Sequence, residues 1–108
     1  MDVALVFSVR DPNGHEVVLS RSRWRHILNE HPNLAKLLAD LRATVQDPHV
    51  IQVKDEAVNP RQYRYYRRFR KGYLLLIVKE GKPRRIWTAW YSLRIREGGR
   101  YEWLSLHD

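Results

Sequence analysis

The apolar run YLLLIV at residues 73–78 constrains the fold more than any other stretch of the sequence. Its residues do not alternate between apolar and polar, as they would in a strand with one wet face, so it predicts a central strand covered on both faces. The turn signals RKG and EGKP separate it from the strand-like segments RQYRYYRRF (61–69) and RRIWTAWYSL (84–93). Such short connections favour antiparallel neighbours on either side of it.

The part of the chain before residue 50 predicts a β-hairpin followed by two helices. VALVFSV (3–9) and HEVVLS (15–20) are strand-like, and the turn signal DPNG joins them. Four residues then recur at the i, i+3, i+4 and i+7 spacing of a helix face: Trp24, Ile27, Leu28 and His31. Pro32 disfavours a helical backbone at the residue before it, so the first helix should end there. A second helix is predicted from Asn33 to about Gln46, where the dipeptide DP stops it.

Two further strands complete the predicted sheet. VIQV (50–53) precedes a polar loop, KDEAVNP (54–60), and RYEWLSL (100–106) follows the last turn signal as an extra edge strand. The order predicts an α+β domain: an N-terminal β-hairpin, two helices, then an antiparallel β-meander packed on the helices. At 108 residues the chain has room for one domain, which we expect to span residues 1–108.

Net charge is the strongest global property of the sequence. Twenty Lys and Arg against twelve Asp and Glu give a formal charge of +8. Such a chain attracts polyanions, of which nucleic acids are the commonest in a cell. The absence of cysteine excludes disulfides, thiolate nucleophiles and thiolate metal sites. No run is long enough to span a bilayer and no secretory signal is evident, so we expect a cytoplasmic protein without a membrane partner.

Two histidines near the end of the first predicted helix are candidate acid–base groups, because histidine changes charge near neutral pH. His26 and His31 lie about 140° apart around a helix and do not share a face. Glu30, four residues after His26, could orient or charge that ring, whereas His31 continues the apolar stripe. The structural alternative is an exposed His26 and a capping or buried His31. No HExxH motif or carboxylate pair accompanies them, so no zinc site is predicted.

The segment RQYRYYRRFRK (61–71) is a candidate RNA surface. Alternation places Arg64, Tyr66 and Arg68 on one face of a strand, with Arg67 on the other. Guanidinium groups bind phosphate and aromatic rings stack on unpaired bases. The alternative is an edge strand whose charges discourage aggregation.

Two polar residues on the later strands are weaker candidates. Lys79 ends the central apolar strand, and Thr88 lies in WTAWY among Trp87, Trp90 and Tyr91. A hydroxyl among large aromatic residues either makes a local hydrogen bond or faces a cleft. A lysine at the end of a strand usually meets solvent.

Five motifs, in this order, resemble the phage-associated branch of the barnase–EndoU–colicin–RelE (BECR) nuclease fold, called PBECR domains: RWRHILNEHP, DPHVI, RYYRR, YLLLIVK and WTAWY. The resemblance covers roughly residues 14–92. The sequence departs from the family pattern at YLLLIVK, where leucines replace valines, and at WTAWY, where Trp90 precedes the tyrosine. Neither change removes a reactive group. The C-terminal RYEWLSLHD has no counterpart in this resemblance.

The resemblance implies a metal-independent, toxin-like endoribonuclease without a cofactor, in which the ribose 2′-hydroxyl attacks the adjacent phosphate. It implies His26 and His31 as acid and base, without deciding which is which, and Arg67, Arg68 and Lys79 as phosphate-binding cations. Thr88 would position phosphate or a protonated histidine, and Tyr66 or Tyr91 would stack a base or donate a proton. The candidate catalytic residues are His26, His31, Arg67, Lys79 and Thr88, and the candidate RNA-binding residues are Arg64, Tyr66, Arg68 and Tyr91.

The expected partners are RNA and an acidic antitoxin or immunity protein that would cover the basic cleft. Two other function classes stay open: a non-catalytic RNA-binding module, and a protein-interaction or phage structural domain. The nuclease hypothesis depends on one spatial expectation. The imidazoles of the helix and the cations of the sheet must converge on one solvent-accessible hollow.

Overall fold

The computed structural model describes residues 4–55 and 60–105, so most of the predicted loop 54–60 lies outside the described residues. The elements in chain order are β1 (Leu5–Arg10), β2 (Glu16–Ser20), α1 (Arg21–Glu30), the 3₁₀ helix η1 (Pro32–Leu34), α2 (Leu38–Gln46), β3 (Val50–Asp55), β4 (Gln62–Phe69), β5 (Gly72–Lys79), β6 (Arg84–Ser92) and β7 (Arg100–Leu104). The predicted α+β class is confirmed.

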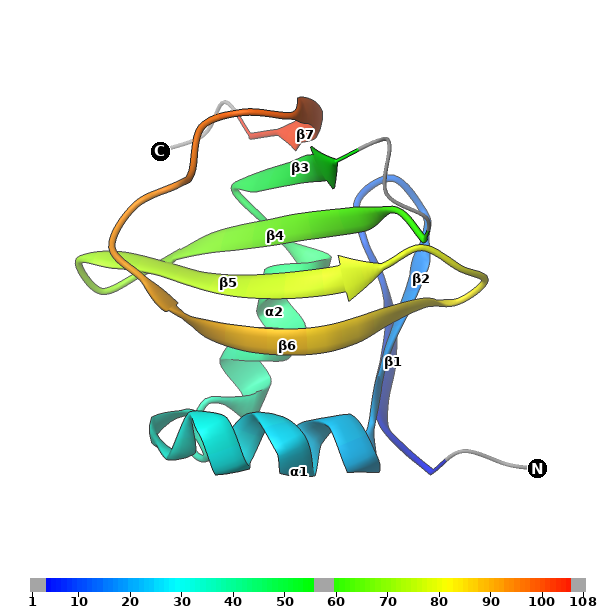
Figure 1. The fold of residues 1–108 in the computed structure, drawn as a ribbon, viewed down its shortest axis with the longest axis vertical. Helices are drawn as coiled ribbons and strands as arrows, with labels where there is room; N and C mark the ends of the chain where they lie inside the picture. The colour runs from blue at the N-terminus through cyan, green and yellow to red at the C-terminus, as the bar shows by residue number, and fades with distance from the viewer. Residues whose placement is uncertain (1–3, 56–59, 106–108) are drawn as a thin grey trace.

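The strands form one seven-stranded sheet in the order β1-β2-β6-β5-β4-β3-β7. The predicted antiparallel meander is confirmed for β3 to β6, with β5 paired along its length to β4 and β6. Two features differ from a simple meander. β2 joins β6 in parallel, over two residue pairs. β7 pairs with β3 rather than with β6, because β2 and α1 already flank the other side of β6 and leave β3 as the available edge (Figure 1).

Both faces of the central strand are covered, as its unbroken apolar run predicts. On one face the larger core packs against α2, which lies behind the sheet in Figure 1. On the opposite face a smaller cluster of Val50, Tyr66, Leu75 and Ile77 is covered by Ile95 from the loop between β6 and β7. We call this second side of β3–β6 the open face. It faces the viewer in Figure 1.

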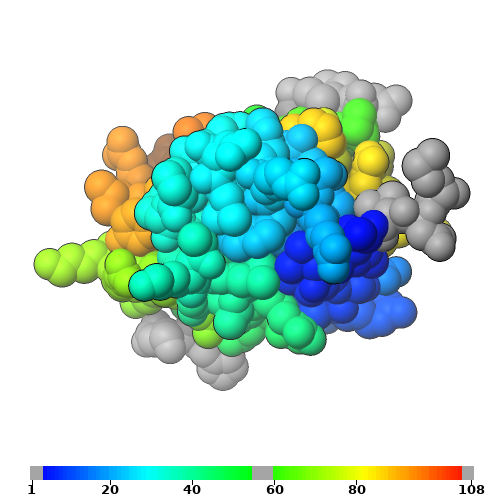
Figure 2. Space-filling view, turned by 90° about the horizontal axis from the view of Figure 1, so that it is seen from below, coloured from blue at the N-terminus to red at the C-terminus, as the bar shows by residue number. Residues whose placement is uncertain are grey.

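Helix α1 runs along the edge of β6 (Figure 1). Its N-cap is Ser20, whose hydroxyl accepts a hydrogen bond from the Arg23 backbone N–H at 3.2 Å. Ile27 is fully buried in the core, and the helix ends at Glu30, as Pro32 predicts. Figure 2, viewed from the side of α1, shows α1 and the segment after it covering much of this side, with β1 beside them.

The second predicted helix is shorter than expected. A continuous helix from Asn33 to Gln46 was expected, but the chain forms η1 and then begins α2 only at Leu38. The backbone N–H groups of Leu34, Ala35 and Leu37 each bond to the carbonyl three residues earlier, which is the 3₁₀ pattern. This tight turn buries Leu34 before α2 starts. The predicted end of the helix before Asp47 is confirmed.

Candidate functional site

The strand register decides which candidate residues share the open face. Thr88 lies opposite Ile77, which lies opposite Arg64, and Trp90 lies opposite Leu75, which lies opposite Tyr66. Paired residues of neighbouring strands point to the same side of a sheet. Five candidates therefore belong to the open face: Arg64, Tyr66, Arg68, Lys79 and Thr88.

The loop between β6 and β7 seals two of these residues from solvent. Tyr66 is fully buried, and its Oη accepts a hydrogen bond from the Arg96 backbone N–H at 3.3 Å. Arg64 is buried and donates from Nη1 to Gln52 Oε1 at 2.9 Å. The predicted RNA contacts of Arg64 and Tyr66 are therefore wrong, because neither side chain can reach a base or a phosphate. Arg68 remains exposed.

Arg67 and Tyr91 lie on the other face of the sheet. Both flank Leu74 in the register, and Leu74 belongs to the core on the α2 side. Tyr91 lines a pocket of about 520 Å³ there, beside Lys36 and Arg70. The expected convergence of all predicted cations on one hollow is therefore wrong for Arg67, which the pleat directs away from Lys79 and Thr88. The edge-strand alternative is also wrong, since β4 lies inside the sheet.

Trp87 is clamped between two cations. The Arg23 Cζ lies 3.8 Å from the centroid of the Trp87 ring, and the Lys79 Nζ lies 3.4 Å from it. Two groups this close to one centroid would overlap on the same face, so they occupy opposite faces of the ring. Arg23 also donates from Nε and Nη2 to the Trp87 carbonyl oxygen, at 3.0 and 2.6 Å. Among the described residues neither cation has a carboxylate within ion-pair distance.

A register shift in β6 produces this arrangement. Ile77 pairs with Thr88, whereas the next residue of β5, Val78, pairs with Ile86. Trp87 is thus the additional residue of a β-bulge, a feature that re-aims side chains at the edges of sheets. The bulge turns the indole toward Arg23 on α1 and Lys79 on β5.

Thr88 adds a hydrogen-bonding group with no partner. Its Oγ1 is buried and makes no hydrogen bond within the part of the chain that the structure describes. Lys79 is its diagonal neighbour on the open face, two positions beyond Ile77. An unsatisfied buried hydroxyl costs about 1–3 kcal/mol, so Thr88 Oγ1 would gain from a partner if the side chains that cover it moved aside.

Of the two candidate histidines, the structure places His31 against this region. His31 is half-buried, and its ring stacks on that of Trp90 with centroids 6.3 Å apart and planes inclined by 29°. His26 is exposed and its Nε2 pairs with Glu30 Oε1. Arg23 precedes His26 by three residues and Glu30 by seven, so it shares their side of the helix. Among the described residues no hydrogen bond, ion pair or ring contact joins His26 to β5 or β6, so its place near the site rests on this helix spacing.

These residues form what we call the α1–β6 site: Arg23, His26, His31, Lys79, Trp87, Thr88 and Trp90. It combines two imidazoles with two cations and one hydroxyl that have, respectively, no carboxylate and no hydrogen-bond partner in the part of the chain that the structure describes. Such a set can transfer protons and stabilise negative charge on a phosphate.

Residues 4–103 match the family model PBECR2, described as phage-Barnase-EndoU-ColicinE5/D-RelE like nuclease2. The chain belongs to this family. The match confirms the resemblance and extends it beyond residues 14–92, into β1 and most of β7, so the last strand is part of the PBECR2 pattern. No curated protein and no solved structure matches the chain.

Two general properties of this PBECR2 domain bear on its surroundings and its ligands. Within residues 4–55 and 60–105, neither helix has the length and apolar character needed to cross a membrane. In the same residues no three His, Asp or Glu side chains gather closely enough to hold a metal ion.

A second polar cluster, which we call the buried network, was not predicted. The Tyr65 hydroxyl donates to Asp11 Oδ2 at 2.6 Å, and Arg84 Nη1 donates to Tyr65 Oη at 2.8 Å. Arg84 also makes a two-pronged contact with Glu102, at 2.8 and 3.2 Å. Burial, together with Asp11, raises the pKa of Tyr65. Burial alone would lower the pKa of Arg84, but Glu102 and Tyr65 outweigh it and raise that pKa.

Sequence reasoning missed three members of the α1–β6 site. Arg23 and Trp87 are 64 positions apart, and their contact depends on a bulge that no local pattern reveals. In the sequence Trp90 stands out only as part of the apolar surroundings of Thr88. The one available signal was the unusual concentration of tryptophan in WTAWY.

Proposed function

We propose that this PBECR2 domain is a metal-independent endoribonuclease and that the α1–β6 site is its reaction centre. One observation carries the proposal: within residues 4–55 and 60–105, two cations without carboxylate partners clamp Trp87 beside a buried hydroxyl that lacks a partner. A phosphate on the Lys79 side of the ring would neutralise the positive charge of Lys79. Its oxygens would accept from Thr88 Oγ1 once the side chains that cover this hydroxyl move aside.

The proposed reaction uses the nucleophile that RNA itself carries. One histidine removes the proton of the ribose 2′-hydroxyl as the bond from O2′ to phosphorus forms. The other protonates the 5′-oxygen as its bond to phosphorus breaks, leaving a 2′,3′-cyclic phosphate and a 5′-hydroxyl. Lys79 and Thr88 stabilise the charge that develops on the phosphate oxygens. DNA lacks the 2′-hydroxyl and would not react.

The two histidines differ in environment in a way that suits two different roles. Glu30 holds the His26 ring and would balance the charge that the ring gains with a second proton. His31 has one face against Trp90 and is partly withdrawn from water.

Substitution of the histidines tests the proposal. Wild-type protein should cleave single-stranded RNA in the presence of EDTA. His26→Ala and His31→Ala should each reduce the rate by about 10²–10⁴-fold, with affinity for RNA changed only a few-fold. The matched control is His15→Ala, because His15 is an exposed histidine on the turn between β1 and β2, outside the site. This variant should keep wild-type activity.

Two other results would replace the proposal by its alternatives. RNA binding with a steep salt dependence but no cleavage would indicate a non-catalytic RNA-binding module. No binding at physiological salt would favour a protein-interaction or phage structural domain.

The same proposal includes a toxin-like role in the cell. A free ribonuclease would harm the cell that makes it, and a domain of charge +8 is readily covered by an acidic antitoxin or immunity protein. Induced expression should arrest growth, and His31→Ala should relieve the arrest. Equal toxicity of the two proteins at equal expression would contradict a toxic role based on cleavage.

A further inference from the structure

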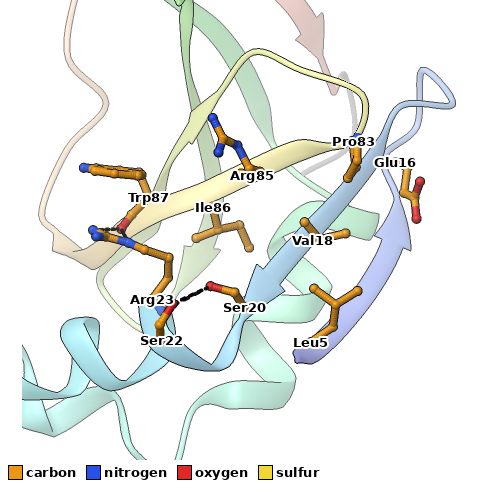
Figure 3. Close-up of a pocket in the computed structure, with 10 residues that line it drawn as sticks. All are labelled: Leu5, Glu16, Val18, Ser20, Ser22, Arg23, Pro83, Arg85, Ile86 and Trp87. Atoms are coloured by element: carbon orange, nitrogen blue, oxygen red, sulfur yellow. Dashed lines mark hydrogen bonds between the residues drawn. The ribbon is translucent and has the colours of Figure 1, made fainter. Parts of the chain in front are cut away.

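A pocket opens where β2 and β6 separate. The two strands pair only at Val17 with Arg84 and at Val18 with Arg85, and beyond this point they diverge toward α1. The space between them is a pocket of about 590 Å³, within the range of small-molecule sites. We call it the β2–β6 pocket, and Figure 3 draws its lining: Leu5, Glu16, Val18, Ser20, Ser22, Arg23, Pro83, Arg85, Ile86 and Trp87.

The lining combines apolar surface with a few polar groups. Leu5, Val18 and Ile86 contribute aliphatic side chains from three different strands (Figure 3). The hydroxyls of Ser20 and Ser22 bond to each other at 3.2 Å at the start of α1. Apolar surface with a small number of hydrogen-bonding groups is typical of pockets for flat heterocycles, whose faces are apolar and whose edges are polar.

Arg85 provides an unengaged cation at this pocket. Its side chain is exposed and projects away from the β6 backbone (Figure 3). Among the described residues it has no hydrogen bond or ion pair. Guanidinium groups recognise both phosphate oxygens and the acceptor edges of bases, so the charge favours part of a nucleic acid over an apolar or cationic ligand.

The pocket adjoins the α1–β6 site. Arg23 and Trp87 belong to both, and they form one end of the pocket (Figure 3). Thr88 is the next residue along β6, and Lys79 lies on the Trp87 ring. For a nucleotide whose phosphate meets Lys79 and Thr88, the pocket therefore lies within reach of the base. The base would enter it across the wall formed by Arg23 and Trp87.

We infer that the β2–β6 pocket is a base-binding subsite, which holds a nucleobase next to the phosphate that is cleaved and so selects where RNA is cut. Its part in cleavage rests on the proposed function. Binding of a base to the pocket can be measured without cleavage, so the subsite and the proposed function can fail separately.

The test is a titration of ¹⁵N-labelled protein with each of the four nucleoside 3′-monophosphates, followed by NMR. Ribose 5-phosphate serves as the probe that lacks a base. At least one nucleotide should shift the amide signals of Ser22 and Arg85 and bind at least about tenfold more tightly than ribose 5-phosphate, since stacking of a base contributes about 1–3 kcal/mol.

Two variants that fill the pocket make the test specific. Leu5→Trp places an indole into it from β1, and Ser22→Phe does so from α1, so that one can replace the other if either fails to fold. Each should remove the tenfold preference for the nucleotide. The matched control is Leu104→Trp, the same change at an exposed leucine on the opposite edge strand, which should keep that preference.

Equal affinity for ribose 5-phosphate and all four nucleotides would overturn the inference. Unchanged nucleotide binding in a folded pocket-filling variant would do the same. Cleavage of RNA without base-dependent binding would overturn the subsite alone. Nucleotide binding in the pocket by a protein that never cleaves RNA would support the subsite and overturn the proposed function.

Discussion

The buried network and the α1–β6 site are both clusters of charged and polar groups on β6, but they treat charge in opposite ways. In the buried network the Arg84 side chain is only 6% exposed and meets Asp11, Tyr65 and Glu102. In the α1–β6 site the cations lie on an aromatic ring without carboxylates, and Thr88 Oγ1 has no partner among the described residues. Charges that hold this fold together are thus neutralised inside it, whereas charges left without carboxylates are available to a ligand.

The two clusters are joined through one strand. Arg84 and Arg85 are the residues of β6 that pair with β2, and the bulge at Trp87 follows at once. The buried network therefore anchors β6 just before the point at which it presents the site. A reaction centre needs such a rigid support, because small displacements of catalytic groups are costly. The comparison predicts that substitutions in the two clusters separate stability from activity.

The largest effect is expected in the buried network. Arg84→Ala would leave two carboxylates and a tyrosine hydroxyl without their shared cation, so the free energy of unfolding should fall by about 3–5 kcal/mol. Urea denaturation measures this change. The neighbouring Arg85→Ala, at an exposed side chain without hydrogen bonds among the described residues, should change it by less than about 0.5 kcal/mol. Equal effects of the two substitutions would remove the distinction between the clusters.

Lys79→Met should have the opposite effect, with a large loss of activity and little loss of stability. The aliphatic stem is kept and the charge is lost, so stability should change by no more than about 1 kcal/mol, the value of an exposed cation–π contact. The kcat/KM for RNA cleavage should fall by about 10²–10³-fold, because a preorganised charge is removed from the transition state. Lys54→Met, at an exposed lysine of β3, is the control and should retain wild-type kcat/KM. Full activity of Lys79→Met would exclude Lys79 from the reaction centre.

Thr88→Val should separate stability from activity by the change of a single atom. Replacing a buried hydroxyl that lacks a partner among the described residues by a methyl group should leave the free energy of unfolding unchanged or raise it by up to about 1 kcal/mol. Cleavage should fall by about tenfold, the effect of losing one hydrogen bond to phosphate, and Thr88→Ser should restore most of it. Thermal unfolding measures the change in stability, and single-turnover kinetics measures the change in cleavage rate. A clear loss of stability would show that the hydroxyl has a structural partner.

The smallest effect is expected at Arg68, which lies on the open face outside both clusters. Arg68→Ala should leave stability within about 0.5 kcal/mol. If Arg68 meets a phosphate, the slope of log K against log[salt] for RNA binding should fall by about one, with little dependence on sequence. An unchanged slope would show that Arg68 makes no contact with the RNA backbone.

Local sequence patterns were sufficient for much of the fold. The unbroken YLLLIV run predicted the central strand, Pro32 predicted the end of α1, and alternation predicted the two faces of β4. Each of these depends on neighbours close in sequence or on a general rule of side-chain periodicity. The break between η1 and α2 was missed, because both a continuous helix and a 3₁₀ turn are compatible with the same leucines.

The site was less predictable because its contacts are long-range. Alternation placed Arg64 and Tyr66 on the correct face, but no local pattern shows that the loop carrying Ile95 and Arg96 covers that part of the face. Likewise, the parallel pairing of β2 with β6 and the bulge at Trp87 bring Arg23 to β6 from a distant part of the chain. Sequence alternation thus predicted the face on which a side chain lies more reliably than its accessibility.

The products of cleavage test the central claim most directly. A DNA oligonucleotide that carries ribonucleotides at only a few positions is incubated with the protein and EDTA, and the fragments are analysed by mass spectrometry. We predict breaks only on the 3′ side of ribonucleotides, each leaving a 2′,3′-cyclic phosphate and a 5′-hydroxyl. Breaks between deoxyribonucleotides, or fragments ending in a 3′-hydroxyl and a 5′-phosphate, would contradict a reaction in which the RNA supplies its own nucleophile.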